Sequence, residues 1–495
     1  MNEKNIWHKI RVALMSITVM VFMIIGFLIF IRPTESELEK RKLAVFPSPT
    51  TRTVLDGSFF KDIVTWYADT YPLREKMIAF QSDAEEMYGI RDTVIYGDTG
   101  QTADAIPSGN EETAPIISNI DEETSDNTVD ESTSDEDNST RQEQNIDNAS
   151  TSAVKEIAEN ATVSGSADTV TKSNENINVQ NKKDNSKDKP LKDGTLKVQP
   201  EVAGTVYIAE NRGFTLYYFY KKGADLYASM LNTVAKKVEN IASLYDIVVP
   251  NSFGVNLDED IQKSMNTSNQ GEAIDYIYKR LNPSIKTVET YKQLRNHNSE
   301  YLYFKTDHHW TALGAYYVYR SFCEVKGITP HELKDYKKKE FPDFLGSFYA
   351  YSNQSKALAK NPDTVEAYIP IATNKETITP REGKPYTYDI ISDANKFSAA
   401  NKYLAFIGGD QPLIEIKNPR LSDDSSCIII KESYGNAFIP FLVDHYQHVY
   451  VVDYRYYTGN VVNLAKKHSN TDIVFLNNTA ATSVEKSKLM LGIFK

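Results

Sequence analysis

One segment of the 495-residue chain limits what the rest can fold into. From Gln101 to Lys197 the sequence contains no Phe, Tyr or Trp, and Ser, Thr, Asn, Asp, Glu and Lys predominate. A segment of this composition cannot bury enough apolar surface to offset the entropy that it would lose on ordering. We therefore predict a long disordered linker over residues 101–199, which interrupts the folded part of the chain.

A second segment, residues 12–31, comprises twenty uncharged and mostly apolar residues. As a helix it would span roughly 30 Å, the thickness of the hydrocarbon core of a membrane. Basic residues precede it and acidic residues soon follow, so the positive-inside rule makes residues 1–11 a cytoplasmic tail and places the remainder outside. A cleaved signal sequence is the alternative. The residues after the span offer no small-x-small cleavage site, which favours an uncleaved transmembrane signal anchor in the cell membrane.

Net charge and cysteine content argue against a nucleic-acid-binding protein, a disulfide-rich protein and a four-thiolate zinc protein. The net charge of −12 argues against nucleic acid as a partner, because phosphate binding relies on clustered Lys and Arg. The two cysteines, Cys323 and Cys427, are too few for a disulfide framework or a four-thiolate zinc site. We expect both to be ordinary buried thiols.

After residue 200, short apolar runs typical of strands alternate with longer runs of helical spacing. The strand-like runs are residues 246–253, 300–304, 403–409, 426–433, 448–455 and 472–478, and residues 204–223 read as a hairpin. Continuous apolar strands separated by helices indicate a mostly parallel sheet that is covered on both faces. We predict an α/β domain over residues 200–495. Residues 32–100 would form a juxtamembrane stem and the start of the folded domain, with amphipathic helical spacing over 57–90 that Pro72 interrupts.

The first polar cluster of interest is Asp307-His308-His309. It lies between the run 300–304 and a helix that Thr311 would cap and Gly327 would end. In an extended loop Asp307 and His309 point the same way and His308 the opposite way. An aspartate beside a histidine can fix the imidazole tautomer, as a general base requires. The alternative is a loop in which these side chains only satisfy local backbone groups.

The second cluster is at Ser433, which follows an apolar strand and precedes a predicted helix, as a nucleophile on a strand-to-helix elbow does. The N–H groups of Ser433, Tyr434 and Gly435 would there be able to stabilise an oxyanion. We assign Gly435 and Asn436 to oxyanion or substrate binding. The alternative is a serine that only caps a helix.

Two further interpretations concern ligands. A metal site at Asp307, His308 and His309 is the weaker interpretation of the first cluster, because adjacent residues cannot easily place three ligands on one ion. We expect no metal and no other cofactor. Arg455 ends a strand-like run and is a candidate contact for an anionic or sugar group, with a structural salt bridge as the alternative.

These motifs resemble a known family. The runs "TDHHWT", "IIIKESYGNAFIPFL" and "VVDYRYY", with "ESELEKRKLAVFP" and "DIVTWYADTYPLREK" in the stem, resemble the DHHW protein family, a relative of the SGNH-hydrolase-like proteins that help O-acetylate alginate. The resemblance implies a three-layer α/β/α SGNH-hydrolase-like domain with a catalytic triad. Asp307 matches the orienting acid, His309 the base and Ser433 the nucleophile. Glu432 stands where the family often has Asp, and the order Asp, His, Ser is permuted relative to ordinary SGNH hydrolases.

We therefore expect a membrane-anchored, extracytoplasmic SGNH-like O-acyltransferase, specifically an O-acetyltransferase, or an esterase, acting on a cell-surface polysaccharide. The resemblance also implies a membrane-bound O-acyltransferase as partner. The alternative is a non-catalytic carbohydrate-binding or scaffold protein of the cell envelope, in which the many tyrosines would form stacking platforms.

Overall fold

The computed structural model describes residues 32, 35–36, 41–42, 45–50, 53, 58–71, 103–109, 112–117, 193–204 and 206–495. The chain divides into two compact units, residues 1–92 and 93–495. Residues 12–31, for which we predict a membrane anchor, lie outside the described residues. Among the helices that are described, none is both long enough and apolar enough to cross a membrane.

In the first unit, the short strands β1 (Glu35–Ser36) and β2 (Arg41–Lys42) pair antiparallel, and α3 (Ser58–Asp69) is the described helix. The guanidinium of Arg32 lies 4.2 Å from the centre of the Trp66 ring and donates a 3.1 Å hydrogen bond to Thr70 Oγ1. Helix α3 ends three residues before Pro72, which cannot continue a helix. The helical start of the predicted stem is thus confirmed, and its continuation beyond Tyr71 lies outside the described residues.

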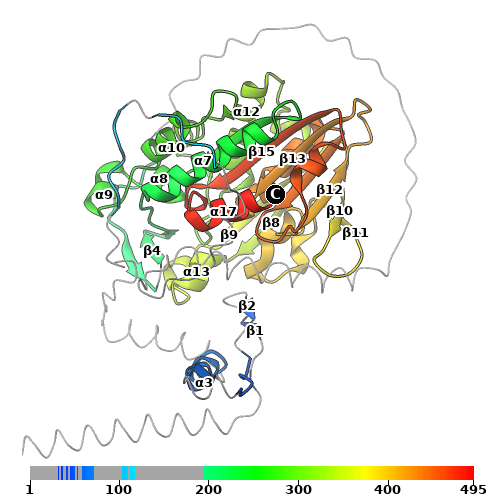
Figure 1. Ribbon diagram of the computed structural model, residues 1–495. Coiled ribbons are helices and arrows are strands. Elements are labelled where there is room, and N and C mark those ends of the chain that lie inside the picture. Colours follow the sequence, from blue (N-terminus) through cyan, green and yellow to red (C-terminus); the bar gives the residue numbers. More distant parts are fainter. Residues whose placement is uncertain are drawn as a thin grey trace, which may run out of the picture. The chain divides into compact units, whose positions relative to one another are not determined.

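The second unit is built on an eight-stranded sheet with the order β11-β10-β12-β14-β13-β15-β6-β7 (Figure 1). Its parallel part consists of β14 (His448–Asp453), β13 (Ser425–Lys431), β15 (Asn470–Asn478), β6 (Ala242–Val249) and β7 (Lys286–Thr287). Antiparallel strands continue it beyond β14, namely β12 (Leu413–Lys417), β10 (Lys375–Thr379) and β11 (Tyr386–Asp389). The α/β class is confirmed, but the antiparallel edge was not predicted. Both β10 and β12 alternate buried and more exposed residues, as strands with one solvated face do.

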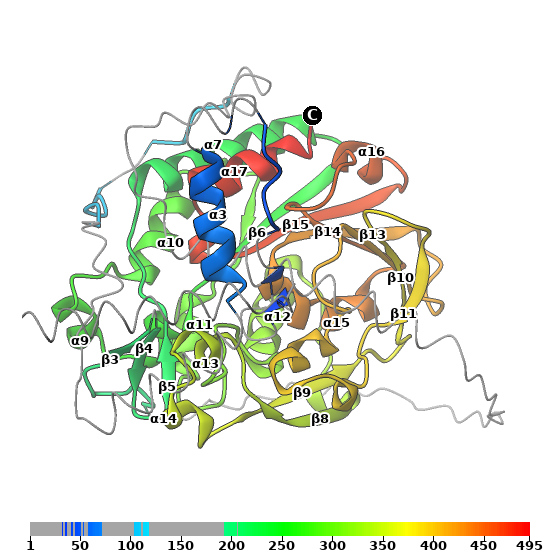
Figure 2. The ribbon, with the colours of Figure 1, turned by 90° about the horizontal axis from the view of Figure 1, so that it is seen from below.

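Side chains of the central strands point alternately into two hydrophobic cores. In β13, Cys427 and Ile429 enter one core, whereas Ile428 and Ile430 enter the other. Helices α12 (Ala312–Lys326) and α15 (Ile439–Leu442) cover the first core, and α7 (Lys221–Lys237), α10 (Gln270–Lys279), α16 (Val461–Ala465) and α17 (Val484–Gly492) cover the second. Figure 2 shows α7 and α17 together on one side of the strands and α12 and α15 on the other. The unit therefore has three layers, with the sheet in the middle.

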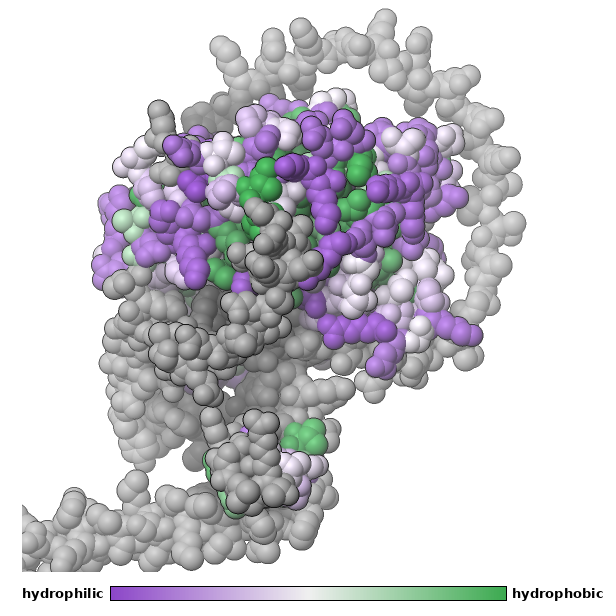
Figure 3. All heavy atoms as spheres, in the orientation of Figure 1, coloured by the Kyte–Doolittle hydropathy of each residue, from purple (hydrophilic) through white to green (hydrophobic). Residues whose placement is uncertain are grey.

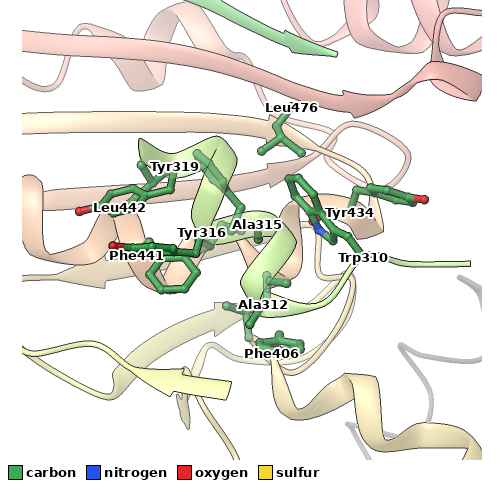
Figure 4. Close-up of a cluster of buried hydrophobic side chains, with 14 of the residues drawn as sticks. Trp310, Ala312, Ala315, Tyr316, Tyr319, Phe406, Tyr434, Phe441, Leu442 and Leu476 are labelled. Carbon is green, nitrogen blue, oxygen red and sulfur yellow. The ribbon is translucent and has the colours of Figure 1, made fainter. Parts of the chain in front are cut away.

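Helix α12 begins and ends where its sequence predicts. The Thr311 hydroxyl accepts a 3.3 Å hydrogen bond from the Gly314 N–H, and Gly327, with a φ of 79°, terminates the helix in the left-handed conformation. Figure 4 shows Tyr316 and Tyr319 of this helix beside Phe441 of α15 in the first core. Capping and packing together fix where the preceding loop, which carries Asp307 and His309, must end.

Two predicted strands are not strands of the sheet. Residues 300–304 form one isolated bridge, Tyr303 to Trp310, and their backbone pairs within its own loop: the Thr311 N–H donates to Leu302 O at 2.8 Å. Residues 403–405 belong to the 3-10 helix η3 (Ala399–Ala405). Short apolar runs fit a strand and a buried turn equally well, and periodicity alone cannot separate the two.

The remaining elements surround this core. A small antiparallel sheet contains β3 (Glu201–Ala203), β4 (Val206–Ala209) and β5 (Arg212–Phe214), and the β4–β5 pair confirms the predicted hairpin. Strands β8 (Lys337–Phe344) and β9 (Asp363–Ile369) pair with each other. The short helices are α8 (Ser252–Asn256), α9 (Glu259–Ser264), α11 (Tyr291–Asn296), α13 (Ser347–Tyr351), α14 (Lys356–Ala359), η1 (Leu333–Asp335), η2 (Ala394–Lys396), η4 (Ser433–Ala437), η5 (Val443–His445) and η6 (Thr479–Ala481). On the face drawn in Figure 3, hydrophilic residues predominate among those coloured.

Both ends of the predicted linker 101–199 belong to the second unit. The Ala114 N–H donates to Arg280 O at 2.8 Å, and its carbonyl accepts from Asn232 Nδ2 at 2.8 Å. At the other end, Leu196 bridges to Leu257. The predicted boundaries are therefore wrong, because backbone hydrogen bonds and aliphatic side chains hold these ends without any aromatic residue. Residues 118–192 lie outside the described residues, and the linker stays a prediction there.

We predict that the ends of this segment affect stability and its middle does not. Replacing residues 112–117 by Gly/Ser should lower the free energy of unfolding by about 2 kcal/mol, since the side chains of Ala114 and Ile117 no longer pack on the second core and glycine raises the entropy of the unfolded chain. Replacing residues 118–192 by a Gly/Ser linker long enough to span the same ends should leave the urea unfolding midpoint unchanged. Equal losses in the two variants would contradict this division.

Candidate active site

Asp307, His309 and Ser433 form one chain of hydrogen bonds. His309 Nδ1 lies 2.6 Å from Asp307 Oδ1, and His309 Nε2 lies 2.8 Å from Ser433 Oγ. All three side chains are buried. Because the carboxylate accepts the proton on Nδ1, Nε2 is left unprotonated toward the serine hydroxyl, as a general base requires. The predicted convergence of residues 124 positions apart is confirmed.

The Asp307 carboxylate is fixed from both sides. Its Oδ1 also accepts the His309 backbone N–H at 3.0 Å, and its Oδ2 accepts the Ser347 N–H at 2.8 Å. A Cβ added to Gly346 would lie 2.2 Å from Asp307 Oδ2, so the carboxylate occupies space that only glycine leaves open. The acid therefore has little freedom to turn away from the imidazole.

The loop that carries the histidine is anchored by Asp363, the first residue of β9. Its carboxylate accepts the Thr306 N–H at 2.7 Å, the Thr306 hydroxyl at 2.6 Å and the Lys305 N–H at 3.0 Å. Burial raises the pKa of Asp363, and these hydrogen bonds oppose that shift by stabilising the charged form. Polar contacts to β9 thus hold a loop that is not attached to a strand of the central sheet.

Ser433 begins η4 two residues after the end of β13, and Glu432, which lies between them, caps this turn. One oxygen of Glu432 accepts the Tyr434 N–H at 3.1 Å, and the other accepts the Asn478 N–H at 2.9 Å. Glu432 Oε2 also lies 3.2 Å from Ser433 Oγ, so the serine hydroxyl has a second acceptor within reach. We predicted no role for Glu432, although its position immediately before the serine was a signal for one.

These contacts change the prediction for the oxyanion donors. The Tyr434 N–H is directed to Glu432 Oε2, and the Gly435 N–H donates to Glu432 O at 2.9 Å. Two of the three predicted donors therefore stabilise the turn itself. The described residues supply no acceptor for the Ser433 N–H, which makes it the better candidate.

Gly435 and Asn436 face a buried cluster of ions instead of the triad. A Cβ on Gly435 would lie 2.6 Å from Lys431 Cβ, so glycine is needed for the close packing of this lysine. Asn436 Nδ2 donates to Asp410 at 3.0 Å, and none of the described residues forms a hydrogen bond with its buried Oδ1. The assignment of these residues to oxyanion or substrate binding is therefore not supported by their positions.

The ion cluster comprises Lys431, Asp410, Asp453 and Arg455. Lys431 Nζ lies 2.6 Å from Asp410 and 3.1 Å from Asp453, and Arg455 binds both oxygens of Asp453 at 2.8 and 2.6 Å. Burial lowers the pKa of Lys431, but the two carboxylates outweigh it and hold that pKa above its usual value. Arg455 thus makes the structural salt bridge that was the alternative to a substrate contact.

Aromatic residues complete the surroundings of the triad. The Tyr403 ring stacks on His309 with centroids 3.9 Å apart and planes at 12°, and its hydroxyl donates to Ser433 O at 3.0 Å. The Trp310 indole donates to Tyr434 O at 2.8 Å, while the Tyr434 hydroxyl donates to His308 O at 2.6 Å. Figure 4 shows Trp310 and Tyr434 side by side. Sequence reasoning missed Tyr403 because it read residues 403–409 as a strand.

We predicted that His308 would point away from the triad, as it would in an extended loop. The structure contradicts this prediction. The loop is bent, and the His308 ring centroid lies 3.8 Å from that of His309. His308 Nδ1 lies 2.7 Å from Ser347 Oγ. Donor atoms of Asp307, His308 and His309 lie within 4.8 Å of one another. We had expected adjacent residues to hold these atoms farther apart. Both nitrogens of His309 are already engaged in the triad, so these residues fit a proton relay better than a metal site.

The sequence matches the model of the DHHW protein family over residues 39–452. This chain belongs to the DHHW family. Residues Asp307 to Trp310 spell the four letters of that name. No curated protein matches this DHHW protein.

Solved structures resemble this DHHW protein to different degrees. A DHHW family protein from Eubacterium siraeum is 30% identical, with a TM-score of 0.53 over 58% of this chain and 95% of that one. Bacillus cereus PatB1 is 19% identical, with a TM-score of 0.48 over 56% and 97% of the two chains. Pseudomonas aeruginosa AlgX is 14% identical, with a TM-score of 0.31 over 61% and 68%. The first of these agrees with the mixed α/β fold described above.

We predict that the buried ion cluster is essential to stability. Lys431→Met leaves Asp410 and Asp453 buried beside one cation fewer, which should cost about 3–5 kcal/mol of unfolding free energy. The matched control is Lys375→Met, since Lys375 makes an exposed ion pair with Asp389 that should contribute under about 1 kcal/mol. Urea unfolding of both variants measures the difference, and similar losses would argue against a special role for the cluster.

Proposed function

We propose that this DHHW protein is an SGNH-like O-acyltransferase or esterase that works through a covalent seryl-acyl intermediate. The observation that supports it is the hydrogen-bond chain from Asp307 through His309 to Ser433. A nucleophile bonded to a base, which is in turn oriented by an acid, is the arrangement that acyl-transfer enzymes share on unrelated folds. The three residues act as orienting acid, base and nucleophile in that order.

In the acylation step, Ser433 Oγ attacks the carbonyl carbon of an acyl donor while His309 Nε2 takes the hydroxyl proton. The Ser433 N–H stabilises the negative oxygen of the tetrahedral intermediate. The intermediate collapses, the donor oxygen leaves with the proton from His309, and the acyl group remains on the serine. Asp307 stays ionised throughout and stabilises the imidazolium.

In the second step, a sugar hydroxyl or water gives its proton to His309 Nε2 and attacks the acyl-serine. Collapse returns the proton to Ser433 Oγ and releases an acylated sugar or a free acid. The face of Tyr403 lies parallel to the imidazole at 3.9 Å and would stabilise its charged form by about 0.5–2 kcal/mol. The protein therefore supplies an aromatic and an ionic partner for the cation that forms in both steps.

The substrate, the partner and the location are proposed from the sequence. The likeness of the five quoted motifs to relatives of the alginate O-acetylation proteins supports acetyl as the group and a cell-surface polysaccharide as the acceptor. A membrane-bound O-acyltransferase would supply the acetyl group across the bilayer. The apolar run over residues 12–31 supports a single-pass anchor with the catalytic domain outside.

We predict that Ser433→Ala and His309→Ala each abolish acetyl transfer from an activated ester, because each removes a group that makes or breaks a bond. Asp307→Asn should cost up to about 10⁴-fold in kcat by favouring the wrong tautomer. The measurements are p-nitrophenol release from p-nitrophenyl acetate, and mass spectrometry of the acetylated serine. Full turnover by Ser433→Ala would exclude covalent catalysis. A non-catalytic carbohydrate-binding protein would show no turnover in the unmodified chain and would still bind sugar after this substitution.

His308→Ala provides the matched control at the neighbouring imidazole. It removes the contact with Ser347 and a ring packed on His309, but no group that transfers the serine proton. Its loss of activity should therefore be much smaller than that of His309→Ala. Equal losses would mean that the loop collapses when either ring is removed, which the melting temperatures of the two variants would reveal.

The proposed location gives a separate prediction. Protease added to intact cells should remove the catalytic domain, because the basic residues before the apolar run keep the N-terminus in the cytoplasm. An epitope at the N-terminus should survive the same treatment. Protection of the whole domain in intact cells, with digestion after lysis, would reverse the topology and leave the chemistry of the triad untouched.

A further inference from the structure

A second cluster of polar side chains lies at the amino ends of the parallel strands, whereas Ser433 of the triad follows the carboxyl end of β13. Asp424 immediately precedes β13, His448 is the first residue of β14 and His468 lies two residues before β15. The three strands are parallel neighbours, so their amino ends meet at this edge. Ser433 follows the other end of β13, about 20 Å away at 3.3 Å per residue. The cluster is thus separate from the proposed catalytic site.

We propose that Asp424, His448 and His468 bind a divalent transition-metal ion, most simply zinc. Each residue offers one donor atom, and the three donor atoms lie within 4.8 Å of one another. Imidazole nitrogen and carboxylate oxygen are the usual non-thiolate ligands of zinc, at about 2.0–2.2 Å. Three protein ligands leave the fourth tetrahedral position to water, as befits a half-exposed site.

Two of the ligands already have the supporting contacts that metal ligands need. His468 Nδ1 lies 2.7 Å from Asp424 Oδ1, and its Nε2 lies 2.9 Å from the Tyr450 hydroxyl. When zinc binds at Nδ1, the ring proton moves to Nε2, where it is donated to the Tyr450 oxygen. Asp424 Oδ2 accepts the Ser469 N–H and hydroxyl, both at 2.9 Å, and so leaves Oδ1 for the ion. Such outer partners orient ligands in known metal sites.

His448 supplies the third ligand. The described residues make no hydrogen bond to its ring nitrogens, and its ring stacks on His468 with centroids 4.4 Å apart. Ligand atoms of a tetrahedral zinc lie about 3.3 Å apart, as bonds of 2.0–2.1 Å require. A turn of the half-buried His448 side chain closes the difference. The nearby Lys417 and Lys467 are exposed, so solvent screens their repulsion of the ion.

The experiment is a calorimetric titration of zinc chloride into the chelator-treated full chain at neutral pH. We expect about one equivalent to bind at this cluster, and the binding to be lost in His448→Ala and His468→Ala. Asp424→Asn changes a side chain that is 51% exposed, so it tests the site without risk to the fold. Tyr450→Phe keeps all three ligands and should weaken zinc affinity by about 10–100-fold.

His308→Ala serves as the control, because the triad loop is the other place where donor atoms gather. Zinc binding that survives His308→Ala but not Asp424→Asn supports the proposal. Binding that is lost in His308→Ala, or that persists in both His448→Ala and Asp424→Asn, overturns it. So does an unmodified chain that takes up no zinc. None of these outcomes depends on whether Ser433 is catalytic.

Discussion

The triad depends on two hydrogen bonds that join the histidine loop to the serine turn. The Trp310 indole donates to the Tyr434 carbonyl, and the Tyr434 hydroxyl donates back to the His308 carbonyl. The backbone of the histidine loop thus accepts a hydrogen bond from an aromatic side chain of the serine turn, and the backbone of the serine turn accepts one from an aromatic side chain of the histidine loop. The separation of His309 and Ser433 is set by this reciprocal pair, since the histidine loop belongs to no strand of the central sheet. Trp310, which follows His309, and Tyr434, which follows Ser433, are therefore as much part of the site as the triad.

The turn that carries Ser433 packs on buried charged residues and not on apolar side chains alone. Lys431 and its carboxylate partners lie beneath η4, and Glu432 satisfies N–H groups from two segments. Buried ions are costly unless each is paired, so such a cluster tolerates few alternative arrangements. We infer that it fixes the direction in which the chain leaves β13. The orientation of the nucleophile follows from that direction.

The sequence predicted the parts of this molecule that are local or strongly periodic. Helix α12 with both caps, strands β13, β14 and β15, and the three triad residues follow from apolar periodicity and from polar residues placed at its ends. The family resemblance supplied the roles of the triad. Strands β10, β11 and β12 were missed because each has only four or five residues, too few for a clear apolar pattern.

The contacts of single side chains were harder to predict. Whether Arg455 faces a substrate or a buried ion cluster depends on Lys431 and Asp410, which come from other segments of the chain. Tyr403 reaches His309 because residues 399–405 form a 3-10 helix and not a strand. The apolar runs 300–304 and 403–409 could not be distinguished from strands by their sequence. The zinc ligands similarly come from three segments whose meeting depends on the order of strands in the sheet.

The described ends of the long interrupting segment are each held on the same domain by noncovalent contacts. Loop-closure entropy rises by only about 0.6 kcal/mol for each doubling of length, so the segment between those ends can lengthen or shorten at little thermodynamic cost. A single cut within it would not separate the pieces at once. The N-terminal fragment would stay bound through residues 103–117, and its release would then depend on protein concentration, as in a dissociating two-chain complex.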